Sequence, residues 1–146
     1  MKISIGSDHG GFNLKEKIKD YFKDSYEFLD RGTYSKESCD YPIFAKKVGE
    51  DVRDGIADSG IVVCTNGIGV TIVANKVKGV RAALCLNESM AEHAKLHNDA
   101  NVLALGETNQ SIDEALKIVK TFVETSFTHE ERHERRVNEI KNMEEK

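Results

Sequence analysis

Short β-rich runs alternate with helical patterns from the N-terminus of this chain to about residue 125. Such alternation is typical of βαβ units, in which helices connect parallel strands. It therefore predicts an α/β fold, with a five-stranded parallel sheet flanked by helices. The five expected strands are residues 2–6, 26–30, 60–64, 80–86 and 102–105.

Capping residues and apolar spacing place the helices. Apolar residues at helical spacing predict the first helix, over residues 12–22. Pro42 is suited to the first turn of the second, and Asn87 can cap a helix that reaches about His97. Capping boxes at Ser111 and Thr128 predict two more helices, the first ending near residue 127.

In the charged segment 129–146, apolar residues recur at a spacing of three: Val137, Ile140 and Met143. This narrow stripe predicts a C-terminal helix that packs on a second subunit, with fraying into solvent as the alternative.

Composition restricts the class of protein. A length of 146 residues predicts a single domain spanning 1–146. The formal net charge of −4 gives no general attraction to nucleic acid or to an anionic membrane. Three irregularly spaced cysteines fit neither a disulfide framework nor a zinc site, and we find no signal peptide or membrane span. We therefore expect a cytoplasmic protein.

An apolar strand in the run 59–76 delivers Cys64 into a glycine turn that opens a helix. The N-terminus of a helix has unpaired N–H groups and a positive dipole end, which bind anions and stabilise a thiolate. The turn is incomplete as a dinucleotide fingerprint, because no third glycine follows Gly67 and Gly69, and it is not a P-loop. The alternative for Cys64 is a small buried apolar residue.

Asp8 and His9 directly follow the first strand. In a doubly wound sheet the first and third strands lie side by side, so their carboxyl ends share a crevice. We therefore expect Asp8 and His9 to lie close to Cys64. The alternative is that Asp8 only caps the following helix while His9 is exposed.

Two further groups stand late in the chain. His97 lies at a predicted helix end and can transfer protons near neutral pH, although a helix-capping role is the alternative. Arg132 and Arg136 are four residues apart, so they share one helix face and can clamp a phosphate. The alternative for the arginines is a solvated, salt-bridged helix.

Together these segments resemble the ribose-5-phosphate isomerase B family, which includes the galactose-6-phosphate isomerase subunits. The resemblance covers nearly the whole chain. It is carried by residues 5–12 (IGSDHGGF), 40–42 (DYP), 67–69 (GIG), 74–76 (ANK), 81–85 (RAALC), 97–101 (HNDAN), 132–133 (RH) and 135–137 (RRV).

The resemblance implies a Rossmann-like sheet, a homodimer or dimer of dimers with active sites at the subunit interface, a phosphorylated sugar as substrate, and no metal or nucleotide cofactor. It implies that Cys64 moves a proton between C1 and C2 of the open-chain sugar, and that His97 opens the ring with help from Asp8 and Asn98. The side chains implied to bind the substrate are those of His9, Tyr41, Thr65, Arg132 and Arg136. The backbone amides implied to stabilise the enediolate are those of Gly67, Ile68, Gly69, Val70 and Thr71.

The chain departs from the family pattern at two places. Many members have Cys-Gly-Thr-Gly or Cys-Gly-Ser-Gly, whereas this chain has Thr65 and Asn66 after the cysteine. The amide of Asn66 can form hydrogen bonds but cannot relay a proton as a hydroxyl does. Many members also have an arginine near Thr108, and its loss would weaken anion binding.

These observations lead to a hypothesis of aldose–ketose isomerisation, with ribose 5-phosphate and ribulose 5-phosphate as the first pair. A six-carbon aldose 6-phosphate of allose or galactose type is one alternative. A sugar-phosphate-binding protein with catalysis weakened by Asn66 is another. The incomplete fingerprint disfavours a dinucleotide-binding oxidoreductase.

Overall fold

The computed structural model describes residues 1–144, and within them it contains one five-stranded sheet in the order β2-β1-β3-β5-β4. All four neighbouring pairs are parallel, which confirms the predicted sheet. The strands are β1 (Lys2–Ser7), β2 (Glu27–Asp30), β3 (Ser59–Cys64), β4 (Ala82–Leu84) and β5 (Val102–Gly106). Strands β1 and β3 are neighbours, as predicted, and the connections leave them in opposite directions.

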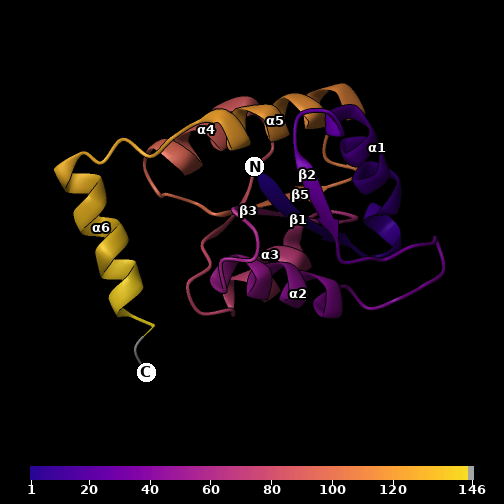
Figure 1. Ribbon diagram of the computed structural model, residues 1–146, viewed down its shortest axis with the longest axis horizontal. Coiled ribbons are helices and arrows are strands. Elements are labelled where there is room, and N and C mark those ends of the chain that lie inside the picture. The colour runs from indigo at the N-terminus through magenta and orange to yellow at the C-terminus, as the bar shows by residue number, and fades with distance from the viewer. Residues whose placement is uncertain (145–146) are drawn as a thin grey trace.

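Helices cover both faces of the sheet, so that the molecule has three layers (Figure 1). Helices α1, α4 and α5 lie on one face, and α2 and α3 lie on the other. The helices are η1 (His9–Gly11), α1 (Phe12–Phe22), α2 (Tyr41–Arg53), α3 (Ile68–Asn75), α4 (Glu88–Leu96), α5 (Ile112–Glu124) and α6 (Glu131–Asn142).

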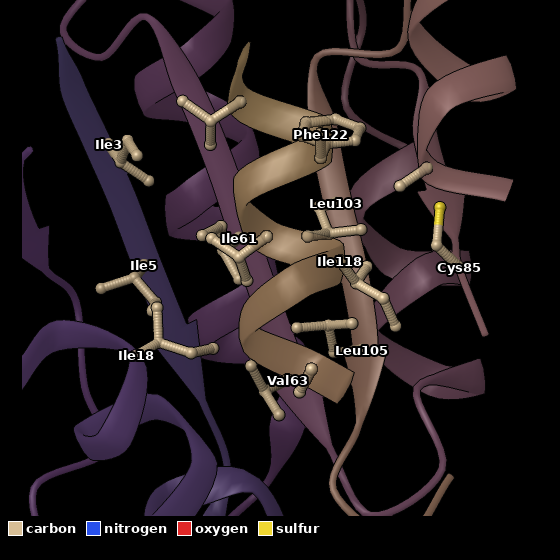
Figure 2. Packing of buried hydrophobic residues seen from close by; sticks show 14 of the residues in the cluster. Ile3, Ile5, Ile18, Ile61, Val63, Cys85, Leu103, Leu105, Ile118 and Phe122 are labelled. Carbon is tan, nitrogen blue, oxygen red and sulfur yellow. The ribbon is translucent and has the colours of Figure 1, made fainter. Parts of the chain in front are cut away.

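Each face of the sheet has its own apolar core. On the α5 side, Ile118 and Phe122 lie over the sheet near Ile61 and Leu103 (Figure 2), and all four side chains are fully buried. On the α3 side, Cys64 packs in the second core. All residues of β3 are buried, and alternate residues of a strand point to opposite faces. The strand is therefore covered on both sides, as expected at the centre of a parallel sheet.

Strand β4 is shorter than predicted. It spans only Ala82–Leu84, whereas the apolar run predicted residues 80–86. At this edge of the sheet the side chain of Asn75 takes the place of a neighbouring strand: its Nδ2 donates to the Ala82 carbonyl at 3.0 Å and its Oδ1 accepts from the Ala82 N–H at 2.8 Å. The prediction was too long because Val80 and Cys85 are buried in the two cores without belonging to the strand, while Leu86 is half exposed.

The segment between α5 and α6 also differs from prediction. Helix α5 ends at Glu124 rather than near residue 127, although Ser111 caps its start as expected by accepting from the Glu114 N–H at 3.1 Å. The capping box predicted at Thr128 is wrong. Thr128 instead accepts from the Glu130 N–H at 3.2 Å, and α6 begins at Glu131 without a side-chain cap.

Helix α6 stands beside the three layers at the end of an extended segment (Figure 1). Val137 is buried, but the other two residues of the apolar stripe are not: Ile140 is 39% exposed and Met143 is 79% exposed. Packing of this helix on a second subunit stays a prediction. The last two residues of the predicted helix, 145–146, lie outside the described residues. Within residues 1–144 no helix is long and apolar enough to cross a membrane.

Candidate active site

The carboxyl ends of β1 and β3 form the edge of a cavity of about 380 Å³. Ser7 pairs with Val63 in the sheet, so Asp8 and Cys64 follow at the same edge. This is the crevice expected where the strand order reverses. The cavity is lined by Asp8, Tyr41, Cys64, Thr65, Asn66, Ile68, Gly69 and Ile72. The structure thus brings together Asp8 and Cys64, as the sequence predicts.

Cys64 is the last residue of β3 and is only 5% exposed. Its Sγ accepts a hydrogen bond from the Gly67 N–H at 3.2 Å. Gly67 has φ +82°, and a Cβ there would come within 2.6 Å of Leu84 Cδ1, so glycine alone fits the turn. The sulfur therefore faces a main-chain donor at the positive end of α3, an arrangement that stabilises negative charge on it.

The two residues between Cys64 and Gly67 point in different directions. Thr65 Oγ1 lies against the η1 turn, where a Cβ on Gly10 would collide with it. Asn66 Oδ1 accepts from the Ile68 N–H at 3.0 Å, so this side chain caps the start of α3. Both residues line the cavity.

The backbone amides predicted to face a substrate are partly occupied. The Gly67 N–H is donated to Cys64 and the Ile68 N–H to Asn66, while the Thr71 N–H bonds to the Gly67 carbonyl at 3.3 Å. Because the first four N–H groups of a helix lack helical partners, those of Gly69 and Val70 are the ones left for a ligand. The role of the five amides in binding a substrate stays a prediction.

Asp8 combines the two alternatives weighed for it, whereas His9 is exposed and does not line the cavity. Asp8 caps η1 by accepting from the Gly11 N–H at 3.1 Å, and it also lines the cavity. His9 is exposed, and its Nδ1 accepts from the Cys39 N–H at 3.2 Å. This bond leaves Nε2 as the ring nitrogen that is free to meet a ligand.

The late-chain residues lie at the other end of the sheet. Strand β5 runs from Val102, beside Gly60, to Gly106, beside Cys64. Its four steps span about 13 Å, and His97 precedes the strand at the amino end. A single chain therefore has two separate groups of predicted site residues. The group at the amino end consists of His97, Asn98, Arg132 and Arg136.

Helix α6 is attached to this second group through aromatic stacking. The rings of His97 and His133 are stacked with centroids 4.1 Å apart and planes 12° apart. His133 is buried, and Arg132 Nε donates to its Nε2 at 3.3 Å. The position of α6 therefore depends on a neutral imidazole at His133.

We expect the docking of α6 to weaken in acid. Burial lowers the pKa of His133 from its ordinary 6.5, and the nearby His97, Arg132 and Arg136 lower it further, against the opposing effect of Glu130. Below pH 6.5 the unfolded chain then binds more protons than the folded chain, so stability falls as the pH drops from 6.5 towards the lower pKa of the folded state.

Amide hydrogen exchange in α6 measures this effect. Exchange is expected to be better protected at about pH 7.5 than at about pH 5.5 after correction for intrinsic rates. His133→Phe keeps an aromatic ring but cannot titrate, so its protection is expected to lose this pH dependence. Equal protection of wild-type α6 at both pH values would contradict the expectation.

Sequence reasoning assigned no role to Arg81, whose side chain is 13% exposed. Its guanidinium donates to the carbonyls of Asp99, at 2.8 and 3.0 Å, and of Asn98, at 3.3 Å. Asp99 has a left-handed backbone, with φ +48°. Arg81 therefore holds the loop that follows His97. Arg81 is the first residue of segment 81–85, one of the segments that resemble the family, and this was the signal that could have pointed to its role.

Sequence reasoning also missed Glu107, which lies in the turn after β5. Its Oε1 accepts from the Leu14 N–H at 2.8 Å and so caps α1 across 93 residues of sequence. No local pattern reveals such a distant cap. Among residues 1–144, no three His, Cys, Asp or Glu side chains gather as metal ligands do.

The fold and the site together define a class of protein: a doubly wound α/β protein with a thiol and a helix N-terminus in a crevice suited to a small anion. Residues 3–140 match the family described as Ribose/Galactose Isomerase. The chain therefore belongs to the ribose/galactose isomerase family and is a sugar-phosphate isomerase.

The chain is very similar to two solved structures and to a further relative in sequence. Ribose-5-phosphate isomerase B of Clostridium thermocellum is 52% identical with a TM-score of 0.96, covering 99% of this chain and 97% of that chain. The enzyme of Mycoplasma genitalium with bound ribulose-5-phosphate is 39% identical with a TM-score of 0.93, covering 99% and 96%. Galactose-6-phosphate isomerase subunit LacB of Clostridium acetobutylicum is 41% identical over 87% of this chain and 74% of its own length.

Proposed function

We propose that this protein interconverts ribose 5-phosphate and ribulose 5-phosphate, with Cys64 as the base. The observation that carries the proposal is the Sγ of Cys64 at the cavity, facing the Gly67 N–H at 3.2 Å. Isomerisation removes a weakly acidic proton beside a carbonyl, so it needs a base and preorganised donors for the developing oxyanion. The first turn of α3 supplies such donors at Gly69 and Val70.

The proton transfer conserves the atoms of the sugar. The Cys64 thiolate takes the proton from C2 of the open-chain aldose, and the electron pair moves to form an enediolate. The thiol returns the proton to C1, while a second proton moves from the oxygen on C2 to the oxygen on C1. No oxidant or reductant is required, because C1 is reduced as C2 is oxidised.

The active form in this proposal is a homodimer. His97 and Cys64 are separated by the length of β5, so the partner's His97 would complete the site. Exposed apolar side chains border the cavity: Tyr41 is 38%, Ile68 is 53% and Ile72 is 57% exposed. Apolar residues gathered at one place on a surface are typical of an interface.

Two groups of residues would then act on one sugar phosphate. In this arrangement the partner's His97 opens the sugar ring, assisted by the partner's Asn98 and by Asp8 of the first chain. The phosphate is bound by His9 together with the partner's Arg132 and Arg136, since guanidinium groups bind phosphate through paired hydrogen bonds. Tyr41 and Thr65 line the pocket around the sugar.

Conversion of ribose 5-phosphate to the ketose, followed by the absorbance of ribulose 5-phosphate, tests the substrate. The ribulose-5-phosphate bound to the Mycoplasma genitalium relative supports a five-carbon sugar. Allose 6-phosphate and galactose 6-phosphate belong in the same panel because of the similarity to LacB. The proposal fails if folded, reduced protein converts none of these sugars. If the protein prefers a six-carbon sugar, the alternative substrate class, the six-carbon aldose 6-phosphates, replaces ribose 5-phosphate in the proposal.

A binding protein with weak catalysis is the second candidate, and the position of Asn66 favours it. Its Oδ1 is committed to the Ile68 N–H, so only the amide NH₂ group is left to face the cavity. An NH₂ group donates hydrogen bonds but does not relay a proton. Tight binding of a sugar phosphate in calorimetry without turnover would support this candidate.

Asn66→Thr separates the two candidates. The hydroxyl of threonine can pass a proton between the two substrate oxygens. If Asn66 limits catalysis, as the second candidate holds, we expect kcat to rise severalfold with KM little changed. Steady-state kinetics on ribose 5-phosphate measures both constants. Asn66→Ala, which restores no hydroxyl, is the matched control and should not raise kcat. A lower kcat in Asn66→Thr than in wild type would show that this chain uses the asparagine itself.

A further inference from the structure

The loop that carries Cys64 is fastened to the turn after β5 by successive hydrogen bonds. The Glu107 N–H donates to the Cys64 carbonyl at 2.9 Å, and the Thr108 N–H donates to the Thr65 carbonyl at 3.1 Å. The first of these bonds is the last of the parallel ladder between β3 and β5, and the second ties the next residue of each chain segment together beyond the ends of the strands.

A side chain makes the next bond in this series. Asn109 Nδ2 donates to the Asn66 carbonyl at 2.9 Å, where the main chain no longer provides a partner. The approach is close: a Cβ on Gly106 would collide with both the Asn66 carbonyl carbon and the Asn109 amide nitrogen. The end of β5 is therefore shaped so that Asn109 can reach the loop.

The bond from Asn109 bears on the sulfur of Cys64 through one peptide group. The Asn66 carbonyl and the Gly67 N–H belong to the same planar peptide, and in a trans peptide they point in opposite directions. Asn109 holds the carbonyl, and the N–H on the other side donates to Cys64 Sγ at 3.2 Å. Fixing one side of the plane therefore aims the other side.

We propose that Asn109 is a positioning residue for Cys64, because it holds the Asn66–Gly67 peptide in the orientation that directs a hydrogen bond at the reactive sulfur. The effect on turnover rests on the proposed function of Cys64 as the base. The effect on the sulfur itself does not, since a thiolate near a main-chain donor reacts with alkylating agents whether or not a sugar is present.

The turn after β5 makes one more side-chain bond to the cysteine loop. Thr108 Oγ1 donates to the Thr65 carbonyl at 2.9 Å, beside the bond from its own N–H. The carbonyls of Thr65 and Asn66 are thus both held from the same turn, which indicates that this turn and the cysteine loop form one unit.

The test compares Asn109→Leu with wild type in two measurements. Leucine has a similar size but no donor, and Asn109 is exposed, so the fold should be retained and is checked by thermal unfolding. We expect kcat for the aldose phosphate to fall about tenfold, with KM little changed. The rate of Cys64 alkylation by iodoacetamide, followed on its own peptide by mass spectrometry, should fall by a comparable factor.

Two further variants act as controls. Asn109→Gln keeps an amide donor and is expected to recover most of both rates. Asn13→Leu makes the same chemical change at another exposed position and should match wild type in both measurements.

Each outcome decides the proposal. Parallel losses in Asn109→Leu with recovery in Asn109→Gln support it. An unchanged alkylation rate in Asn109→Leu overturns it, whatever happens to kcat, because Asn109 would then not act through Cys64. If wild type isomerises no sugar phosphate while alkylation still depends on Asn109, the positioning role stands and the proposed function fails.

Discussion

Cys64→Ala is expected to reduce kcat by about 10²–10⁴-fold, the contribution of a positioned general base. The variant removes the one sulfur that faces the cavity and the Gly67 N–H. The phosphate should bind almost as tightly as before, because the residues proposed to bind it do not include Cys64. Steady-state kinetics gives kcat, and calorimetry with ribose 5-phosphate gives the affinity.

Cys85→Ala is the matched control for this change. Cys85 is buried in the core on the α5 side, and burial raises the pKa of its thiol to about 11, so it has no thiolate at neutral pH. Its removal should leave kcat unchanged. Turnover at the wild-type rate in Cys64→Ala would mean that another group is the base. A loss of affinity as large as the loss of kcat would mean that the cysteine acts in binding.

Mixing two inactive variants is expected to restore activity. If each site combines Cys64 of one chain with His97 of the other, then Cys64→Ala and His97→Ala are both inactive alone. In a mixed dimer one site carries both changes and the other carries neither. Random mixing makes half of the dimers mixed, so about a quarter of the wild-type activity should return.

The mixture is prepared by unfolding and refolding equal amounts of the two variants together, and its activity is compared with each variant refolded alone. The double variant Cys64→Ala/His97→Ala mixed with Cys64→Ala is the control, and it should give no recovery. A mixture of the single variants that stays inactive, although mass spectrometry shows mixed dimers, would place both residues in the same chain's site.

The sequence predicted the sheet because its central strands carry strong local signals. The run 59–64 and the strand before Asp8 each lead into a glycine turn. The rule for doubly wound sheets then predicts that these two strands lie side by side. The edge strand was predicted less well. Ala82 bonds to a side chain of α3 rather than to a further strand, and no local pattern shows where such an edge ends.

The sequence indicates single candidate residues of the site but not how they lie relative to one another. Asp8 follows β1 and Cys64 ends the adjacent strand β3, so their closeness could be inferred from topology. His97 is the C-cap residue of α4 and lies near the amino end of β5, at the opposite end of the sheet from Cys64. The order of motifs along the chain does not give this separation in space. The hydrogen bond by which Asn109 holds the cysteine loop joins residues 43 apart in sequence. Secondary-structure propensities and the spacing of motifs do not predict such a contact.

The separation of the two groups along β5 affects how this enzyme would lose activity. In an enzyme whose site lies within one chain, inactivation on dilution means that chains unfold. In the proposed dimer, a separated chain could keep every hydrogen bond of its sheet and still be unable to turn over a sugar, because the partner's His97, Arg132 and Arg136 would no longer lie near its cysteine. Specific activity should then fall on dilution while circular dichroism stays constant, and adding inactive Cys64→Ala chains to the diluted enzyme should raise activity again.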